Sequence, residues 1–224
     1  MTRTEAVARI LRDIGFRPAG GSMDDHIVSC LQEAQDDLER GKTLPPFLLV
    51  EDQTLTLTSG THTVAIPTGF IRESDETRIR FFPPNSSVPV FLERKLYIDA
   101  VMANLHASTD SDATVEPVAP AVYVLRKSTI DFITTADQNY TLYWDYYKAA
   151  DVLSSGSTEN AWLADKSARM WLVGEAGLRI AQSLRDANAA TVFQKLRDAG
   201  RAATFGEQIA AETASGPFRM GANL

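Results

Sequence analysis

The spacing of apolar residues changes twice along this chain, and these changes limit the folds it can adopt. Residues 3–16 and 22–41 place apolar side chains three and four positions apart, as on one face of an α-helix. Most of residues 43–147 instead show the two-residue alternation of strands, and helical spacing returns after residue 158. Because the strands do not alternate with crossover helices, a doubly wound parallel sheet is not expected. The pattern predicts an α+β fold, with a helical bundle formed from both chain ends and an inserted antiparallel β domain.

Helix-breaking residues suggest where the domains begin and end. Gly41 ends the second helical segment, and the polar run 154–158 reads as a linker. Gly216, Pro217 and Gly221 preclude a helix at the C-terminus. We therefore expect a helical bundle from residues 1–42 and 151–215, a mainly β domain at 43–150 with one helix at about 91–107, and an irregular C-terminal tail at 216–224.

Three features predict the arrangement of strands inside the β domain. The alternating segments 54–58 and 64–66 flank a Ser59-Gly60 turn, which predicts a hairpin. Residues 78–81 form a further strand that ends before two prolines. Three more alternating segments lie between Ala121 and Tyr147, and their short connections predict a meander.

The chain lacks the residue clusters that enzymes and metal sites require. His26, His62 and His106 have no second histidine or cysteine at ligand spacing. Cys30 lies on the apolar stripe of its helix, which favours a small buried hydrophobe over a reactive thiolate. Phosphate-loop and nucleophile-elbow motifs are also absent from the sequence. We therefore expect no catalytic residue, no cofactor and no metal.

The charge balance bears on possible partners. The chain has 22 lysines and arginines against 29 acids, which gives 22 − 29 = −7. This balance argues against a protein that gains affinity by neutralising phosphates, although it does not exclude a channel through which DNA slides without adhering. The N-terminus is not followed by an apolar signal region, and no apolar run approaches 18 residues. We expect a protein made and kept in a cytoplasm, without membrane contact.

Glycines, aromatic residues and the tail are candidates for assembly contacts. Gly174 and Gly177 lie on an apolar helical face, where glycine costs about 1 kcal/mol each, so we expect a second helix close to this face. That helix belongs either to the same chain, with 191–205 as the favoured partner, or to a neighbouring subunit. Large aromatic residues near the second strand cluster fit either a core or a subunit interface. The candidate interface residues are Gly174, Gly177, Trp171, Phe218, Met220, Leu224, Tyr146 and Tyr147.

Two blocks of sequence carry a family resemblance. The first covers residues 44–49 and 66–73, on either side of the expected hairpin. The second begins with the alternating strand 140–147, which ends in a tyrosine pair. After a polar loop it continues with 160–163 and a long helix. In order and spacing these blocks resemble the head-to-tail adaptor proteins of tailed bacteriophages.

The resemblance implies a structural role in the virion. It implies a twelvefold ring of this chain below the portal protein, which continues the DNA channel and receives tail, nozzle or tail-terminator proteins beneath. DNA would pass through the ring without specific contacts. The ring would lie in the neck at the head–tail junction and would be assembled in the host cytoplasm, with no enzymatic activity.

Two other functions are compatible with the residues. One is a non-viral or accessory module that binds another protein through its β domain. The weaker one is a hydrolase whose catalytic residues come together only in the folded chain, since catalytic triads are spatial rather than sequential.

Overall fold

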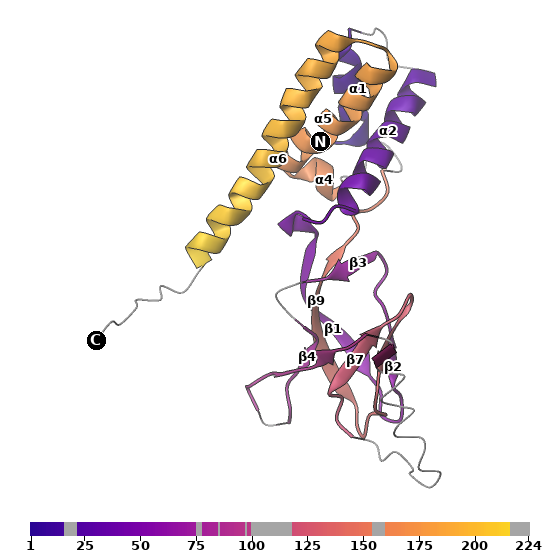
Figure 1. Ribbon diagram of the computed structural model, residues 1–224, viewed down its shortest axis with the longest axis vertical. Helices are drawn as coiled ribbons and strands as arrows, with labels where there is room; N and C mark the ends of the chain where they lie inside the picture. Colours follow the sequence, from indigo (N-terminus) through magenta and orange to yellow (C-terminus); the bar gives the residue numbers. More distant parts are fainter. Residues whose placement is uncertain are drawn as a thin grey trace, which may run out of the picture. The chain divides into compact units, whose positions relative to one another are not determined.

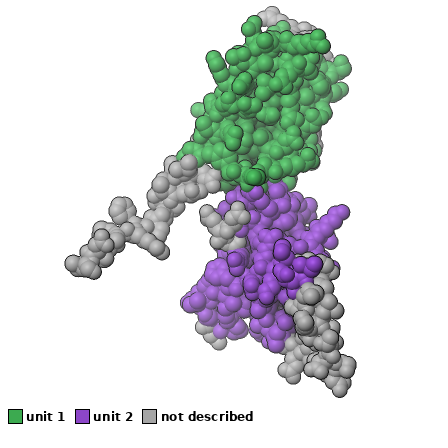
Figure 2. All heavy atoms as spheres, in the orientation of Figure 1, with its two compact units in different colours: residues 1–48, 149–224 green, residues 49–148 purple. Residues whose placement is uncertain are grey.

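The computed structural model describes residues 1–15, 22–74, 78–84, 86–96, 98–99, 118–153 and 160–215. The chain divides into two compact units (Figure 2). Unit 1 combines Met1–Leu48 with Ala149–Leu224, and unit 2 is Leu49–Lys148. Along the chain, helices precede and follow a central β region, and Figure 1 colours both groups by sequence, which confirms the predicted α+β class.

Unit 1 is helical, and side chains at the helix starts satisfy free backbone N–H groups. Thr2 and Glu5 form a capping box on the first helix, while Asn160 and Asp165 cap two later ones. The helices predicted within 3–16 and 22–41 are present as Arg3–Asp13 and Ser22–Glu39. The elements are α1 (Arg3–Asp13), α2 (Ser22–Glu39), the 3-10 turn η1 (Pro46–Leu48), α4 (Ala161–Ala164), α5 (Lys166–Ser183) and α6 (Ala187–Ser215).

A tight turn folds α6 back along α5. Arg185 has a positive φ of 59°, and Asp186 Oδ1 accepts the backbone N–H groups of Asn188 and Ala189 at 3.0 Å each. The Asp186 carboxylate therefore caps α6 directly after the turn. This confirms the break predicted near residues 186–188.

The core of unit 1 forms where the apolar stripes of its helices meet. Ile10, Ile27 and Leu172 are fully buried, and Cys30 is buried as well, at 6% exposure. Burial raises the pKa of the Cys30 thiol, as expected for a cysteine that packs as a small hydrophobe.

Unit 2 contains two sheets among its described strands. One has the order β1-β9-β4-β5, with β3 also paired to β9, and the other has the order β2-β8-β7-β6. We expected an antiparallel β domain. All pairs of described strands are antiparallel except β6–β7, which is parallel. The strands are β1 (Leu49–Leu57), β2 (Thr63–Ala65), β3 (Phe70–Glu73), β4 (Arg80–Phe81), β5 (Val90–Phe91), β6 (Glu93–Arg94), β7 (Val122–Leu125), β8 (Thr129–Phe132) and β9 (Tyr140–Lys148).

The sheet topology corrects the predicted hairpin and the second step of the predicted meander, whereas β7 and β8 pair antiparallel as predicted. β1 and β2 lie in different sheets, as do β8 and β9, because each connection bends from one sheet into the other. The two bends pair with each other: Gly60 N donates to Ala136 O at 2.8 Å, and Ala136 N donates to Thr61 O at 3.0 Å. Gly60 has a positive φ of 76°. This conformation therefore lets the chain turn a corner from one sheet to the other, and it does not reverse the chain within one sheet.

The helix predicted at about 91–107 is wrong at its beginning. Residues 90–91 and 93–94 are the strands β5 and β6, and Leu92 between them is fully buried. Leu92 is buried in the core at the junction between two strands. Its three- and four-residue spacing to later apolar residues therefore did not indicate a helix at this position. Residues 97 and 100–107 lie outside the described residues.

The core of unit 2 lies between the two sheets. Alternate residues of β9 point inward, which places Tyr140, Leu142, Trp144 and Tyr146 in the core at no more than 6% exposure. The ring of Phe70 stacks on that of Trp144 with centroids 4.9 Å apart. The alternation read from the sequence of this strand thus identified its buried face.

Candidate functional site

The two candidate glycines face α6 of their own chain. A Cβ atom on Gly174 would lie 2.4 Å from the backbone nitrogen of Arg197, and one on Gly177 would lie 2.3 Å from Cδ1 of Phe193. Gly200 on α6 provides the reverse contact, since its Cβ would lie 2.3 Å from the backbone nitrogen of Trp171. The small residues therefore let α5 and α6 approach closely, as the sequence predicted for partner 191–205.

The aromatic candidates lie in two different places. Trp171 is buried in unit 1, with its ring centroid 5.7 Å from that of Trp162 and 5.5 Å from that of Phe205. Tyr146 is buried in unit 2, whereas Tyr147 is half-buried with the Arg72 guanidinium 5.3 Å from its ring centroid. Phe218, Met220 and Leu224 lie outside the described residues.

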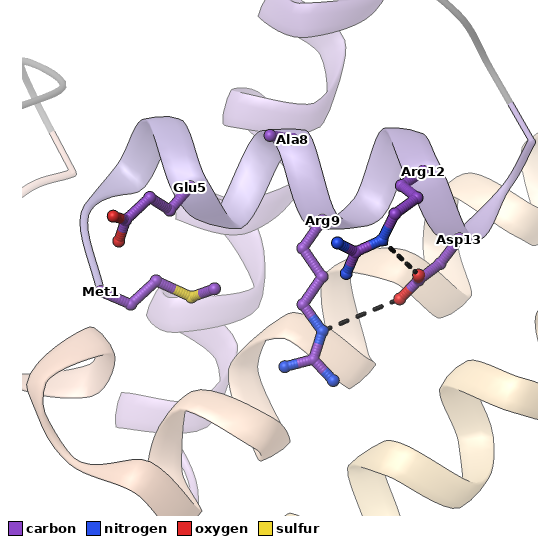
Figure 3. A pocket seen from close by; sticks show the side chains of 6 residues that line it. All are labelled: Met1, Glu5, Ala8, Arg9, Arg12 and Asp13. Atoms are coloured by element: carbon purple, nitrogen blue, oxygen red, sulfur yellow. Dashed lines mark hydrogen bonds and ion pairs between the residues drawn. The ribbon is translucent and has the colours of Figure 1, made fainter.

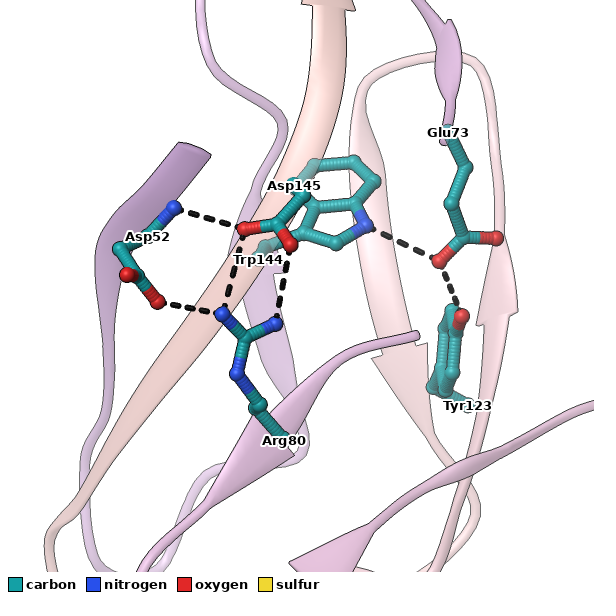
Figure 4. Close-up of polar contacts among 6 residues, drawn as sticks. All are labelled: Asp52, Glu73, Arg80, Tyr123, Trp144 and Asp145. Carbon is teal, nitrogen blue, oxygen red and sulfur yellow. Dashed lines mark hydrogen bonds and ion pairs between the residues drawn. The ribbon is translucent and has the colours of Figure 1, made fainter. Parts of the chain in front are cut away.

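A buried carboxylate joins the two sheets of unit 2 (Figure 4). Glu73 on β3 accepts hydrogen bonds from the Tyr123 hydroxyl on β7 and, at 2.9 Å, from Trp144 Nε1 on β9. Arg94 on β6 pairs with its other oxygen at 3.2 Å. Burial and the neighbouring Glu73 carboxylate raise the pKa of Tyr123, which keeps its hydroxyl protonated as a donor. Glu73 thus bonds one residue of the first sheet and two of the second.

A second polar cluster shapes the edge strand β1 (Figure 4). Asp145 on β9 accepts the backbone N–H of Asp52 at 2.6 Å and pairs with Arg80 on β4 at 3.1 Å. Arg80 also bonds the carboxylate of Asp52, which has a positive φ of 53° at a break in the β1–β9 register. The cluster therefore holds a β-bulge in place.

A third polar cluster anchors the chain where it returns to unit 1. Glu39 at the end of α2 accepts Trp162 Nε1 at 2.8 Å and the backbone N–H of Ala150 at 3.1 Å. Gln35, one turn earlier, accepts Asn160 Nδ2 at 3.0 Å. The charged and amide groups of α2 thus satisfy the buried polar groups of the returning segment.

Glu39 makes the stability of unit 1 depend on pH. Burial raises its pKa above the ordinary carboxyl value, so the folded state holds the proton more tightly than the unfolded chain. The free energy of unfolding therefore falls as pH rises from the ordinary pKa to the raised one. Glu39→Gln keeps an acceptor oxygen without the charge. We therefore expect this variant to be more stable than the wild type at pH values above the raised pKa of Glu39.

The effect of Glu39→Gln on stability should differ between low and high pH. Below the ordinary carboxyl pKa the Glu39→Gln advantage should disappear, because Glu39 is then neutral in both states. Glu39→Ala, which leaves the buried Trp162 donor without an acceptor, should lose roughly 1–3 kcal/mol. Urea unfolding monitored by tryptophan fluorescence between pH 3 and 8 measures the stability of both variants. A difference between Glu39→Gln and the wild type that does not change with pH would contradict a raised pKa for Glu39.

Open hollows on the surface are lined largely by charged residues. One of about 540 Å³ lies along α1 (Figure 3), where Arg9 and Arg12 lie 3.7 and 3.5 Å from Asp13. Another of about 330 Å³ in unit 2 is lined by Glu73, Ser74, Arg78, Arg94, Lys95 and Leu96. Within the described ranges no three His, Cys, Asp or Glu residues come together as metal ligands. His26 and His62 are exposed, and His106 lies outside those ranges.

Sequence reasoning missed the exposed apolar residues of the β4–β5 hairpin. Phe82, Val88 and Phe91 are 43%, 68% and 56% exposed. The available signal was the run of apolar residues around Pro83-Pro84 and Pro89, which marks a short edge hairpin. Assigning residue 91 to a helix concealed it.

Comparison with known proteins agrees with the resemblance seen in the sequence. Among the described residues, none of the helices is long and apolar enough to span a membrane. The search of curated proteins finds no match. The family model for the SU10 adaptor protein matches residues 1–221, which is nearly the whole chain. The chain therefore belongs to the SU10 adaptor protein family and is a phage adaptor with a structural role.

Proposed function

We propose that this chain is the subunit of a ring that joins the phage head to the tail. The ring is twelvefold, docks below the portal protein, continues the DNA channel and receives tail, nozzle or tail-terminator proteins beneath. It lies in the neck of the virion and is assembled in the host cytoplasm. The match of the adaptor family to residues 1–221 carries the proposal, because it includes both units.

The charge of the chain supports the passage of DNA through such a ring. With 22 basic and 29 acidic residues the net charge is 22 − 29 = −7 per subunit. A ring of like subunits repels the phosphate backbone overall, so DNA slides through without adhering. The same charge opposes ring closure in free solution, and a docking template on the portal offsets this repulsion.

The role of the polar clusters favours a scaffold over an enzyme. Glu73, Glu39 and Asp145 are each buried and bonded to groups that their own unit needs to fold. Carboxylates held this way act as structural acceptors. We therefore propose that the chain has no catalytic activity of its own.

The proposed ring can be tested with purified chain and portal protein. We expect sedimentation at micromolar concentration and low salt to show a monomer or weak associations alone, because subunits of charge −7 repel one another. With portal present, electron microscopy should show a twelvefold ring on one portal face. A stable closed ring without portal would contradict the template mechanism, and absence of portal binding would contradict the proposed function.

A further inference from the structure

The β4–β5 hairpin of unit 2 ends in a sheet edge that no other described strand covers. β5 pairs with β4 and with no other described strand. Leu92 N donates to Ile79 O at 2.8 Å, so the alternation of an antiparallel ladder directs the N–H and C=O of Phe91 away from β4. An exposed edge of this kind can accept another strand. In Figure 1 the loop that follows β4 extends away from the sheet.

Aromatic side chains form a row on one face of this edge. Phe91 is the cross-strand partner of Arg80, and Arg80 is the partner of Tyr143, so the three side chains share a face. Phe82 extends the row, with its ring centroid 5.5 Å from that of Tyr143. Phe82 and Phe91 remain 43% and 56% exposed. Exposed aromatic groups beside a free edge are typical of a surface that binds an extended segment.

The C-terminal segment 216–224 has the sequence pattern that such a surface requires. Its apolar residues occupy every second position, at 218, 220, 222 and 224. In an extended chain alternate side chains point to the same side, so all four residues would share one apolar face about 20 Å long. This alternation distinguishes the segment from a helical one, in which the same residues would spread around the axis.

We propose that segment 216–224 of one subunit adds as a strand to the β5 edge of the next subunit, with its apolar face beside the exposed ring of Phe91. The inference rests on the proposed ring, in which each copy must present two different complementary surfaces to its neighbours. The tail is the donor surface and the β4–β5 hairpin is the acceptor. Main-chain bonds at Phe91 supply general affinity, and the exposed Phe91 ring favours the apolar face of the segment.

A fluorescent peptide of residues 216–224 tests the contact directly. The acceptor is the chain shortened to residues 1–215, whose hairpin cannot be occupied by a tail. We expect saturable binding in fluorescence anisotropy, weakened about tenfold or more by Phe91→Ser, since exposed aromatic anchors dominate such contacts. Val152→Ser is the matched control, because Val152 is 69% exposed in unit 1 and should leave binding unchanged.

Two results would overturn the contact. One is the absence of peptide binding, and the other is an equal loss for Phe91→Ser and Val152→Ser. A peptide of the same composition with its alternation scrambled should bind as weakly as the wild-type peptide binds to Phe91→Ser. Equal binding of the scrambled peptide would show unspecific apolar adhesion instead.

Crosslinking on the portal decides whether the tail belongs to a neighbour. Chains carrying Phe91→Cys and chains carrying Met220→Cys are mixed, bound to portal and oxidised. The only native cysteine, Cys30, is buried. We expect a disulfide-linked dimer from the mixture and none from either variant alone. An intramolecular disulfide in the double variant, without dimers in the mixture, would place the tail on its own subunit and overturn the proposal.

The outcomes separate this proposal from the proposed function. Rings that form normally on the portal with Phe91→Ser, together with no peptide binding, would refute the strand contact alone. Peptide binding by a chain that never binds portal would refute the proposed function while leaving the contact between copies in place.

Discussion

Gly174→Ala should destabilise the folded chain by roughly 1–3 kcal/mol, although alanine is the better helix former. The added Cβ would lie 2.4 Å from the backbone nitrogen and 2.6 Å from the Cα of Arg197, and backbone atoms cannot move aside as a flexible side chain can. Helices α5 and α6 would have to separate, and this would loosen the contacts of Gly177 and Gly200 as well. Urea unfolding of the variant measures the loss.

Gly206→Ala is the matched control for this prediction. Gly206 also lies in α6, but nothing lies within 4 Å of the position its Cβ would take. The substitution should therefore stabilise the chain by about 0.5–1 kcal/mol, through helix propensity and a less free unfolded chain. Stabilisation by both substitutions would mean that the α5–α6 contact does not exist in solution.

Glu73→Ala should destabilise unit 2 by roughly 2–6 kcal/mol, because it leaves two buried donors without an acceptor at about 1–3 kcal/mol each. These donors are the Tyr123 hydroxyl and Trp144 Nε1, which are fully buried and belong to different sheets. The loss should reduce the cooperativity of unfolding in unit 2, since Glu73 joins its sheets. Unfolding followed by tryptophan fluorescence and by far-UV circular dichroism measures both effects.

Glu93→Ala tests whether the buried position, and not the loss of an acid, causes the effect. The Glu93 carboxylate is 59% exposed and lies 3.8 Å from Lys95. An exposed pair of this kind contributes little, so the change should stay within about 0.5 kcal/mol. Glu73→Gln, which retains one acceptor oxygen, should fall between the two. Equal losses for Glu73→Ala and Glu93→Ala would show that Glu73 does not join the sheets.

Several features of this chain follow from local sequence patterns alone. The helices α1, α2, α5 and α6 follow from apolar spacing, and the break near 186–188 follows from the polar residues there, because both depend on neighbours within a few positions. The inward face of β9 follows from its two-residue alternation for the same reason. The glycines on α5 indicated that a helix must approach closely, since their cost in a helix requires compensation.

Other features depended on residues distant in the chain. Gly60 could begin either a hairpin or a corner, and the choice was made by its pairing with Ala136, 76 positions away. Val90 and Phe91 form one strand because they pair with β4, and this pairing outweighs the helical spacing that begins at Leu92. Glu73 was one acid among 29 until β3 placed it between Tyr123 and Trp144. Local patterns determine which face of a segment is apolar, whereas only tertiary packing decides which partner covers that face and which polar groups must bond inside it.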